Sequence, residues 1–376
     1  MWSHDSLSAI DGCEPAPRSA ALRGRFCLSL RGSAARPAVR AQASADRPSA
    51  LAVTVMARYG MTVPVDGMPL EDQQVVAAEL DALGYTDVWS SEAMGTDAFT
   101  PLAVAAVASP RLRLGTAIAQ VFNRGPGCLA QTAASLAATA PGRFVLGVGT
   151  SSQLMVEQWN DRQFERPYAR ARDTVRFLRE ALAGERVDRD YETFSVHGFR
   201  LGITLPEPPK IVVAALRQKM LRLAGSEADG AVINWLSAAD VSTVAPLIHE
   251  GGADKEVIAR IIVMLTTDTD EVRRVGARLV STYLTVPVYR EFHRWLGRED
   301  SLAETWQRWA AGDRKGATAA VPDEVIDELV VHGTPDECRA HVARYVANGV
   351  TTPVLSLLPV ADRDQRSCYQ ALAPVT

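Results

Sequence analysis

The sequence predicts an α/β protein folded as a (β/α)8 barrel, the TIM barrel. Short apolar strands alternate with helices eight times between residues 58 and 358, and this alternation is typical of a parallel sheet covered by helices. Small or polar residues follow most of these strands, and in a barrel the carboxyl ends of the strands form the ligand-binding face. A doubly wound open sheet is the alternative that the same alternation allows.

The clearest βαβ unit lies in the first half of the chain. Residues 112–116 and 144–148 are short apolar runs, and each ends in small residues. Between them, Pro126 stands at a first helical position and opens an Ala-rich run with high helix propensity. Because crossover connections between parallel strands are right-handed, we expect these two strands to be parallel neighbours.

The other elements follow the same alternation. Strands are predicted at 58–64, 86–90, 210–214, 230–234, 257–265 and 351–357, and helices at 70–83, 101–108, 166–182, 216–224, 268–284 and 334–348. The last helix begins with a capping box, Thr334-Pro335-Asp336-Glu337. The insertions are a hairpin at 191–204, after the fourth helix, and a partly helical segment at 285–322, after the seventh.

The chain is expected to have three parts. Residues 1–55 contain seven arginines and four acidic residues, with much Ala, Ser and Pro and no sustained periodicity. We therefore expect a disordered extension, either a targeting peptide or the result of a start set upstream of Met56. Residues 56–360 form the expected barrel, and residues 361–376 form a C-terminal tail.

Composition narrows the functional classes. A formal charge of −4 over 376 residues argues against a nucleic-acid or membrane surface as the partner. The five cysteines are odd in number and include no CxxC pair, which favours reduced thiols and a cytoplasmic protein. No histidine occurs between His4 and His197, so we expect no metal site. The arginines of 166–182 are expected to form a solvated, ion-paired face.

Residues at the predicted strand ends form the candidate site. They are Thr62, Trp89, Glu92, Thr116, Ala117, Ile118, Gly149, Thr150, Ser151, Ala214, Ala215, Leu216, Arg217, Asn234 and Trp235. The two tryptophans are candidate walls of a substrate site, and packing inside the barrel is the alternative. Glu92 is the candidate acid, base or hydrogen-bond acceptor, and capping of the next segment is its alternative. The backbone N–H groups of 214–217 suit a phosphate.

One long segment carries a family resemblance. LGTAIAQVFNRGPGCLAQTAASLAATAPGRFVLGVGT resembles the central signature of the luciferase-like oxidoreductases, especially the branch that uses the deazaflavin coenzyme F420. Further matches, in the same order along the chain, are RYGMTVP, GYTDVWSSE, LAGSEADGAVINW and VHGTPDECRAHVARYVANGVTTPVLS. The resemblance implies a TIM barrel that binds the deazaflavin ring at the carboxyl ends of its strands, and it favours a homodimer.

The same resemblance implies roles for individual residues. It implies a non-proline cis peptide at the end of the third strand, here Ala117-Ile118. The turn at 214–217 is implied to receive the phosphate-bearing tail of the cofactor. The residues implied to line the ring or to lie near its polar edge are Gly149, Thr150, Ser151 and Asn123.

The sequence departs from the family members that oxidise alcohols and sugar phosphates. Where these enzymes place an acidic residue followed by His, this chain has Glu92-Ala93, and where the sugar-phosphate enzymes place Glu it has Ser152-Gln153. We therefore predict an F420-dependent oxidoreductase that transfers a hydride between the deazaflavin and a small organic substrate. The alternatives are an FMN-dependent luciferase-like monooxygenase that uses reduced flavin and O2, and a non-catalytic protein that binds F420 or flavin.

Overall fold

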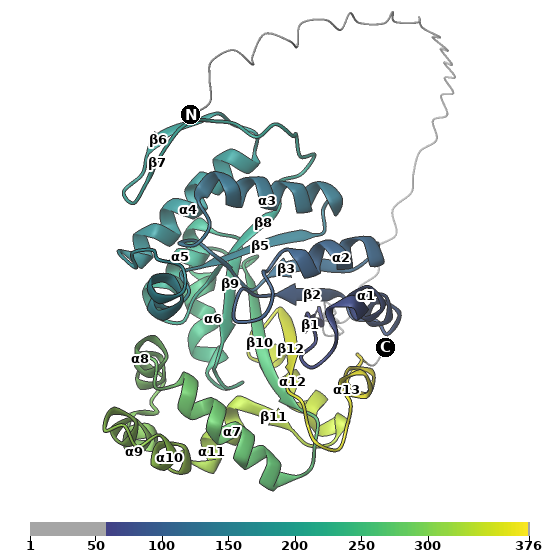
Figure 1. Ribbon diagram of the computed structural model, residues 1–376, viewed down its shortest axis with the longest axis vertical. Helices are drawn as coiled ribbons and strands as arrows, with labels where there is room; N and C mark the ends of the chain where they lie inside the picture. The colour runs from purple at the N-terminus through teal and green to yellow at the C-terminus, as the bar shows by residue number, and fades with distance from the viewer. Residues whose placement is uncertain (1–57, 375–376) are drawn as a thin grey trace, which may run out of the picture. The chain divides into compact units, whose positions relative to one another are not determined.

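A closed parallel barrel is the centre of the computed structural model, which describes residues 58–374 (Figure 1). The main sheet has ten strands, of which β4 (Ala119–Gln120) and β11 (Val330–His332) are additions and the other eight form a ring. In ring order these are β1 (Gly60–Thr62), β2 (Asp87–Ser90), β3 (Arg113–Thr116), β5 (Phe144–Gly149), β8 (Lys210–Ala214), β9 (Gly230–Asn234), β10 (Glu256–Met264) and β12 (Thr352–Leu357). Pairing of β12 with both β1 and β10 closes the ring, so the predicted TIM barrel is confirmed and the open sheet is excluded. The predicted extension, residues 1–55, lies outside the described residues.

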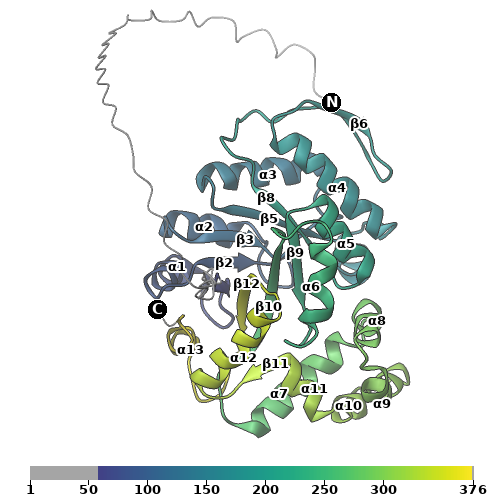
Figure 2. The ribbon, with the colours of Figure 1, turned by 180° about the vertical axis from the view of Figure 1, so that it is seen from behind.

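Helices surround the barrel in both ribbon views (Figures 1 and 2). They are α1 (Gln73–Ala82), α2 (Thr100–Ala108), α3 (Pro126–Thr139), α4 (Pro167–Leu182), α5 (Gln218–Glu227), α6 (Val241–His249), α7 (Thr269–Tyr283) and α12 (Pro335–Ala347). The capping box predicted for α12 is present, because the Thr334 hydroxyl accepts from the Glu337 amide and the Glu337 carboxylate accepts from the Thr334 amide. Sequence reasoning missed α6, which contains Pro246 in its interior.

Both predicted insertions are present. The first is an antiparallel hairpin of β6 (Val187–Asp190) and β7 (Ser195–Phe199), which begins four residues before the predicted range of 191–204. The second contains α8 (Pro287–Trp295), α9 (Glu299–Ala310) and α10 (Arg314–Ala319). After it, α11 (Asp323–Leu329) leads into β11 (Val330–His332), which pairs with the carboxyl end of β10.

The arginine-rich face of α4 is ion-paired, as predicted. Arg172 pairs with Asp173 of the same helix at 2.7 Å, and further partners lie on a neighbouring segment. Arg176 donates through Nε to Glu227, at 2.8 Å, and Arg179 forms an ion pair with Asp229 at 3.0 Å. Glu227 and Asp229 lie at or just after the end of α5. Arg176 and Arg179 therefore join α4 to α5.

The segment predicted as a tail, 361–376, contains the helix α13 (Gln365–Ala371). Tyr369 in this helix is fully buried, and its carbonyl accepts a 2.7 Å hydrogen bond from the Tyr85 hydroxyl. The Tyr369 hydroxyl in turn donates to Glu79 of α1, next to which α13 lies in both ribbon views. The end of the described chain therefore packs on the helix that follows β1.

Side chains that point into the barrel form three layers, because every second residue of a strand faces inward. The lower layer, at the amino ends of the strands, contains Asp87, Arg113, Lys210, Glu256 and Thr352. The middle layer is a buried apolar cluster of Trp89, Val145, Val212, Val232, Ile258 and Val354. The upper layer lies two residues further along the strands. It contains Ala214, Asn234, Arg260 and Ser356, together with Thr62 at the end of β1.

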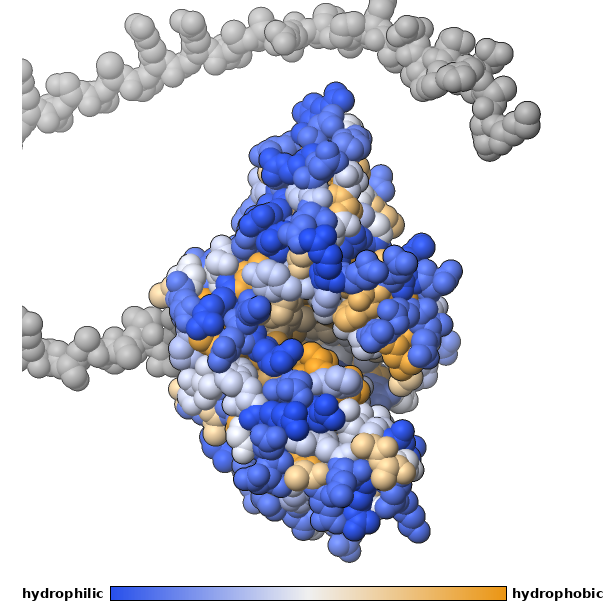
Figure 3. Space-filling view, turned by 90° about the vertical axis from the view of Figure 1, so that its left-hand side faces the viewer, coloured by the Kyte–Doolittle hydropathy of each residue, from blue (hydrophilic) through white to orange (hydrophobic). Residues whose placement is uncertain are grey.

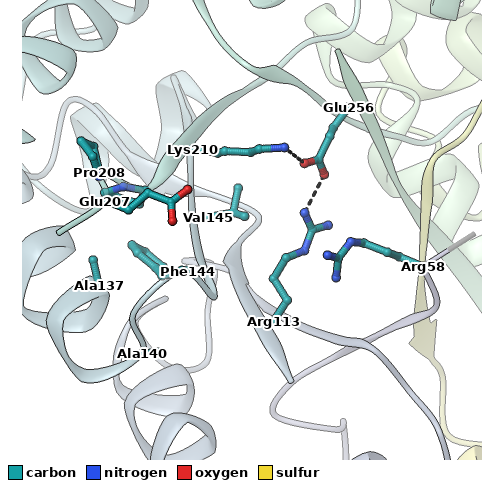
Figure 4. Close-up of a pocket in the computed structure, with 12 residues that line it drawn as sticks. Arg58, Arg113, Ala137, Ala140, Phe144, Val145, Glu207, Pro208, Lys210 and Glu256 are labelled. Atoms are coloured by element: carbon teal, nitrogen blue, oxygen red, sulfur yellow. Dashed lines mark hydrogen bonds and ion pairs between the residues drawn. The ribbon is translucent and has the colours of Figure 1, made fainter. Parts of the chain in front are cut away.

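The lower layer is held by Arg113, which is almost fully buried (Figure 4). Its guanidinium contacts Asp87 at 2.5 Å, Glu256 at 2.7 Å and the Thr352 hydroxyl at 3.2 Å, and Glu256 also pairs with Lys210 at 2.7 Å. Burial lowers the pKa of Arg113, but Asp87 and Glu256 more than offset it, so that the pKa is raised. A cavity of about 180 Å³ adjoins these groups. Each cation is matched by an acid, so the lower layer closes the barrel rather than offering an ion site.

Candidate functional site

The end of β3 departs from regular strand geometry. Gly115 pairs with Val145, and the next pair in the ladder is Ala119 with Val148, so four steps along this strand match three steps along β5. The extra residue forms a β-bulge between β3 and the short strand β4 (Ala119–Gln120). The peptide bond between Ala117 and Ile118 is cis, which confirms that prediction.

The bulge touches β5 so closely that glycine is required there. The Thr116 hydroxyl donates to the Gly147 carbonyl at 2.7 Å and accepts from the Gly147 amide at 2.8 Å. A Cβ atom on Gly147 would lie 1.9 Å from the Thr116 carbonyl oxygen, and one on Gly149 would lie 2.8 Å from Ile118 Cγ1. Small residues at the ends of β3 and β5 therefore create a smooth surface of backbone and aliphatic atoms, and Thr116 contributes to it by joining the strands.

Glu92 anchors the segment that follows the bulge. Its carboxylate accepts from the Gln120 amide at 2.9 Å and from Arg124 Nε at 2.7 Å. The Glu92 amide donates to the Ile118 carbonyl at 3.2 Å. Both carboxylate oxygens are thus used within the loop, which is the capping alternative considered for this residue.

One polar atom without a partner, on Asn123, lies near the surface formed by the bulge and the end of β5. Asn123 donates through its side-chain amide to Gln120, while its Oδ1 atom is buried and has no hydrogen-bond partner within the described part of the chain. Thr150 and Ser151 directly follow β5, and Ser151 has a φ of 62°. A residue in this left-handed region changes the direction of the chain at the end of the strand. An unpaired buried oxygen next to a flat surface fits a ligand with a hydrogen-bonding edge.

Aromatic residues form the opposite wall, and two of them were not predicted. Trp235 follows β9 and stacks on Tyr283 with ring centroids 4.5 Å apart. Tyr283 meets Tyr289 edge-on at 6.1 Å, and the Tyr289 hydroxyl lies 3.5 Å from Asn234 Nδ2. Tyr289 belongs to the insertion helix α8, so only the folded chain brings it to the barrel.

Trp89 and Trp235 are both buried, but they belong to different apolar clusters, and Trp235, at 4% exposed, packs in the main hydrophobic core. Trp89 is 1% exposed and belongs to the middle layer. Its ring fills the space over Gly115, where a Cβ atom would lie 2.2 Å away. These facts match the packing alternative for Trp89, which supports the floor below the site.

The turn after β8 presents an uncapped helix start. Ala215 is buried, Ala214 and Leu216 are half-buried, and Arg217 is exposed. Arg217 is the N-cap of α5, and no side chain accepts a hydrogen bond from the first amides of this helix. Free amides at a helix start favour an anion, so the geometry is compatible with the predicted phosphate turn.

The molecular surface is hollowed on one face (Figure 3). Apolar residues lie on the floor of this hollow, between hydrophilic lobes. Among residues 58–374, no group of three or more His, Cys, Asp or Glu side chains could hold a metal ion. Nor is any helix of this part long and apolar enough to cross a membrane.

Most of the chain matches a known protein family. A model of the luciferase-like monooxygenase family matches residues 42–352. The chain belongs to this family. The resemblance drawn from the sequence is thereby confirmed.

Proteins whose names or bound groups include either F420 or FMN are similar to this chain. A Mycobacterium tuberculosis protein provisionally named a coenzyme F420-dependent oxidoreductase is 27% identical over 320 residues, which cover 77% of this chain and 91% of that protein. The F420-dependent tetrahydromethanopterin reductase of Methanopyrus kandleri has a TM-score of 0.69 at 17% identity, covering 84% of this chain and 97% of that one. The FMN complex of 3,6-diketocamphane monooxygenase from Pseudomonas putida has a TM-score of 0.57 at 16% identity, covering 84% and 96%.

Replacement of Glu92 by Gln separates the two roles considered for this residue in the luciferase-like barrel. If its carboxylate positions the loop, Glu92→Gln weakens the contact with Arg124 and lowers cofactor affinity by about tenfold, because a charge-assisted hydrogen bond contributes about 1.5 to 3 kcal/mol. The pH profile of kcat/KM is then unchanged. Loss of one limb of this profile at unaltered cofactor affinity would instead identify Glu92 as an acid or base.

Proposed function

We propose that this protein is an F420-dependent oxidoreductase that transfers a hydride from the reduced deazaflavin to an electrophilic carbon of a small organic substrate. The observation that supports this most directly is the wall made by the Ala117-Ile118 bulge against Gly147 and Gly149. A flat tricyclic ring needs a surface free of protruding side chains. The relatives with F420 in their names support the deazaflavin as the ring.

Each part of the cofactor has a matching group in this chain. Ala117, Ile118 and Gly149 would support one face of the ring, while Thr150 and Ser151 would line its edge. Asn123 has a buried acceptor oxygen without a partner, which suits an N–H of the ring. The uncapped amides at the start of α5, next to Arg217, would bind a phosphate.

The chain's own residues favour reduction of the substrate over oxidation of an alcohol. Oxidation requires a base that removes the hydroxyl proton, and the Glu92 carboxylate is already paired with Arg124. When bound, the reduced deazaflavin supplies two electrons and one proton as a hydride. Water can supply the second proton, so the substrate gains two hydrogens and no oxidant is needed.

A flavin-dependent reaction is the second candidate. The similar fold of the FMN-bound camphane monooxygenase supports it, because the same barrel type holds a flavin there. A protein that binds the cofactor without turnover is the third. The location of the protein in the cytoplasm and its assembly as a homodimer remain predictions.

Cofactor titration tests the proposal. The full chain is titrated separately with F420 and FMN while quenching of cofactor fluorescence is followed. We expect micromolar binding of F420 and much weaker binding of FMN, followed by oxidation of reduced F420 when an enone, imine or aldehyde is added. The reverse preference would favour the monooxygenase, F420 binding without turnover of any acceptor would favour the binding protein, and binding of neither would overturn the proposal.

A further inference from the structure

Two arginines point into the barrel, and only one of them has an acidic partner: Arg113 is buried, whereas Arg260 is half-buried with a buried Nε atom. Arg113 in the lower layer pairs with Asp87 and Glu256. Arg260 lies in the upper layer, and it forms no ion pair with any carboxylate of residues 58–374. A charge inside the barrel without an ionic partner disfavours folding unless other groups or a ligand compensate it.

The contacts of Arg260 leave much of its guanidinium unsatisfied. One terminal nitrogen donates to the Ser356 hydroxyl at 2.7 Å. The Nε atom is buried and has no hydrogen-bond partner in the described part of the chain. Burial lowers the pKa of Arg260, with Tyr283, Tyr289 and Asp66 opposing this shift in part. An arginine stays charged at neutral pH even so, because its ordinary pKa exceeds 12.

The position of Arg260 relates it to the proposed site. In the ring of eight strands, β10 is four strands from β3 in either direction, so it lies across the barrel from the bulge. Arg260 is paired in register with Asn234 of β9, whose amide lies 3.5 Å from the Tyr289 hydroxyl. A ligand between the two walls would therefore meet the bulge on one side and a cation with polar and aromatic neighbours on the other.

The chemistry of the free groups identifies the missing partner. A guanidinium presents several N–H donors in a fixed plane that matches a carboxylate. Its neighbours Asn234, Ser356 and Tyr289 offer further hydrogen-bonding groups. The Thr62 hydroxyl, in the same layer, is also buried without a partner. None of these neighbours is acidic, and Asp66, whose charge acts on Arg260, forms no ion pair with it, so a ligand is left to pair with the guanidinium.

We propose that Arg260 binds a carboxylate group of the substrate and so selects small anionic electrophiles over neutral ones. The orientation of the substrate rests on the proposed function, because its electrophilic carbon would face the cofactor at the bulge. The binding of the carboxylate itself depends only on Arg260 and its neighbours. Its test therefore does not require F420.

The first experiment measures binding by calorimetry without cofactor. The probes are 4-oxopent-2-enoate and its methyl ester, which share the electrophilic carbon chain and differ in charge. We expect the wild-type protein to bind the acid about 10- to 100-fold more tightly than the ester, as for a charge-assisted bond in a buried site. Arg260→Met removes this preference, and Arg260→Lys keeps part of it. Equal binding of acid and ester by the wild type, or a preference that survives in Arg260→Met, would overturn the proposal.

Two further measurements exclude other roles for Arg260. A purely structural arginine would lower the melting temperature when replaced, whereas we expect Arg260→Met to melt at the same temperature as the wild type or higher. Arg222→Met, which removes an exposed arginine paired with Glu250, is the matched control and leaves the acid preference intact. F420 affinity should be unchanged in Arg260→Met, and a tenfold loss would assign the residue to the cofactor instead. If the acid binds but F420 does not, the proposed function fails while the carboxylate site stands.

Discussion

Replacing Gly147 with alanine is expected to lower the free energy of unfolding by about 3 kcal/mol or more, or to prevent folding. The added Cβ atom would lie 1.9 Å from the Thr116 carbonyl oxygen, and both groups belong to paired strands. The strands can separate only by breaking the two hydrogen bonds of the Thr116 hydroxyl to Gly147. The bulge that carries Ala117 and Ile118 would move with them, so cofactor affinity should fall as well.

Urea unfolding followed by circular dichroism measures the first effect, and fluorescence titration measures the second. The control is Gly95→Ala, because Gly95 is exposed and a Cβ atom there meets nothing within 4 Å. We expect this control to change stability by less than about 0.5 kcal/mol. A Gly147→Ala protein with wild-type stability and cofactor affinity would contradict the close contact between the bulge and β5.

Replacing Arg113, the buried cation of the lower layer, is expected to lower the free energy of unfolding by the second-largest amount. Arg113→Met leaves Asp87 and Glu256 buried without their main partner, and breaking a buried pair on one side destabilises by about 3 to 5 kcal/mol. Arg111→Met is the matched control, because Arg111 pairs with Asp81 at the surface, where its side chain is 71% exposed. Exposed pairs contribute at most about 1 kcal/mol. Equal unfolding midpoints for the two variants would contradict a central role for the lower layer.

The same variant alters the dependence of stability on pH. Burial alone would raise the pKa of Glu256, but Arg113 and Lys210 outweigh it, so the pKa is lowered. A carboxyl whose pKa is lowered by folding stabilises the protein above its unfolded pKa of about 4.3, and this contribution is lost as the pH falls through the folded value. Wild-type stability should therefore decrease as the pH falls below about 4.3, and the decrease should be smaller in Arg113→Met. Urea midpoints measured from pH 6 to pH 3 test this.

The barrel could be predicted from sequence because its signals are local. Apolar runs such as 112–116 and 144–148 end in glycines, and Pro126 marks the start of the helix between them. The same glycines pointed to a flat surface at the end of β5, which the clash distances at Gly147 and Gly149 explain. The helix α6 was missed because Pro246 in its interior is a helix-breaking signal.

Trp235 and Asn234 of the opposite wall were predicted from the end of their strand, but Tyr283, Tyr289 and Arg260 were not, because these residues reach the site only in the folded chain. Arg260 lies in an apolar run that is buried on both faces, so alternation does not reveal which side points inward. Tyr289 contacts Asn234 across 55 residues of sequence, from an insertion with no strand signal. The partner of Glu92 was missed for a related reason, since Arg124 reaches it from beyond the bulge.

The apolar middle layer has a consequence for laboratory evolution of this barrel. Along β10 it separates Glu256, a partner of Arg113, from Arg260 by four residues, a rise of about 13 Å. Substitutions this far apart without shared contacts usually combine additively. Stabilising substitutions around Arg113 can therefore be introduced first. A library that randomises positions near Arg260 then starts from a protein with a higher free energy of unfolding. New substrate preferences can be selected at one end of the barrel without rebuilding the other.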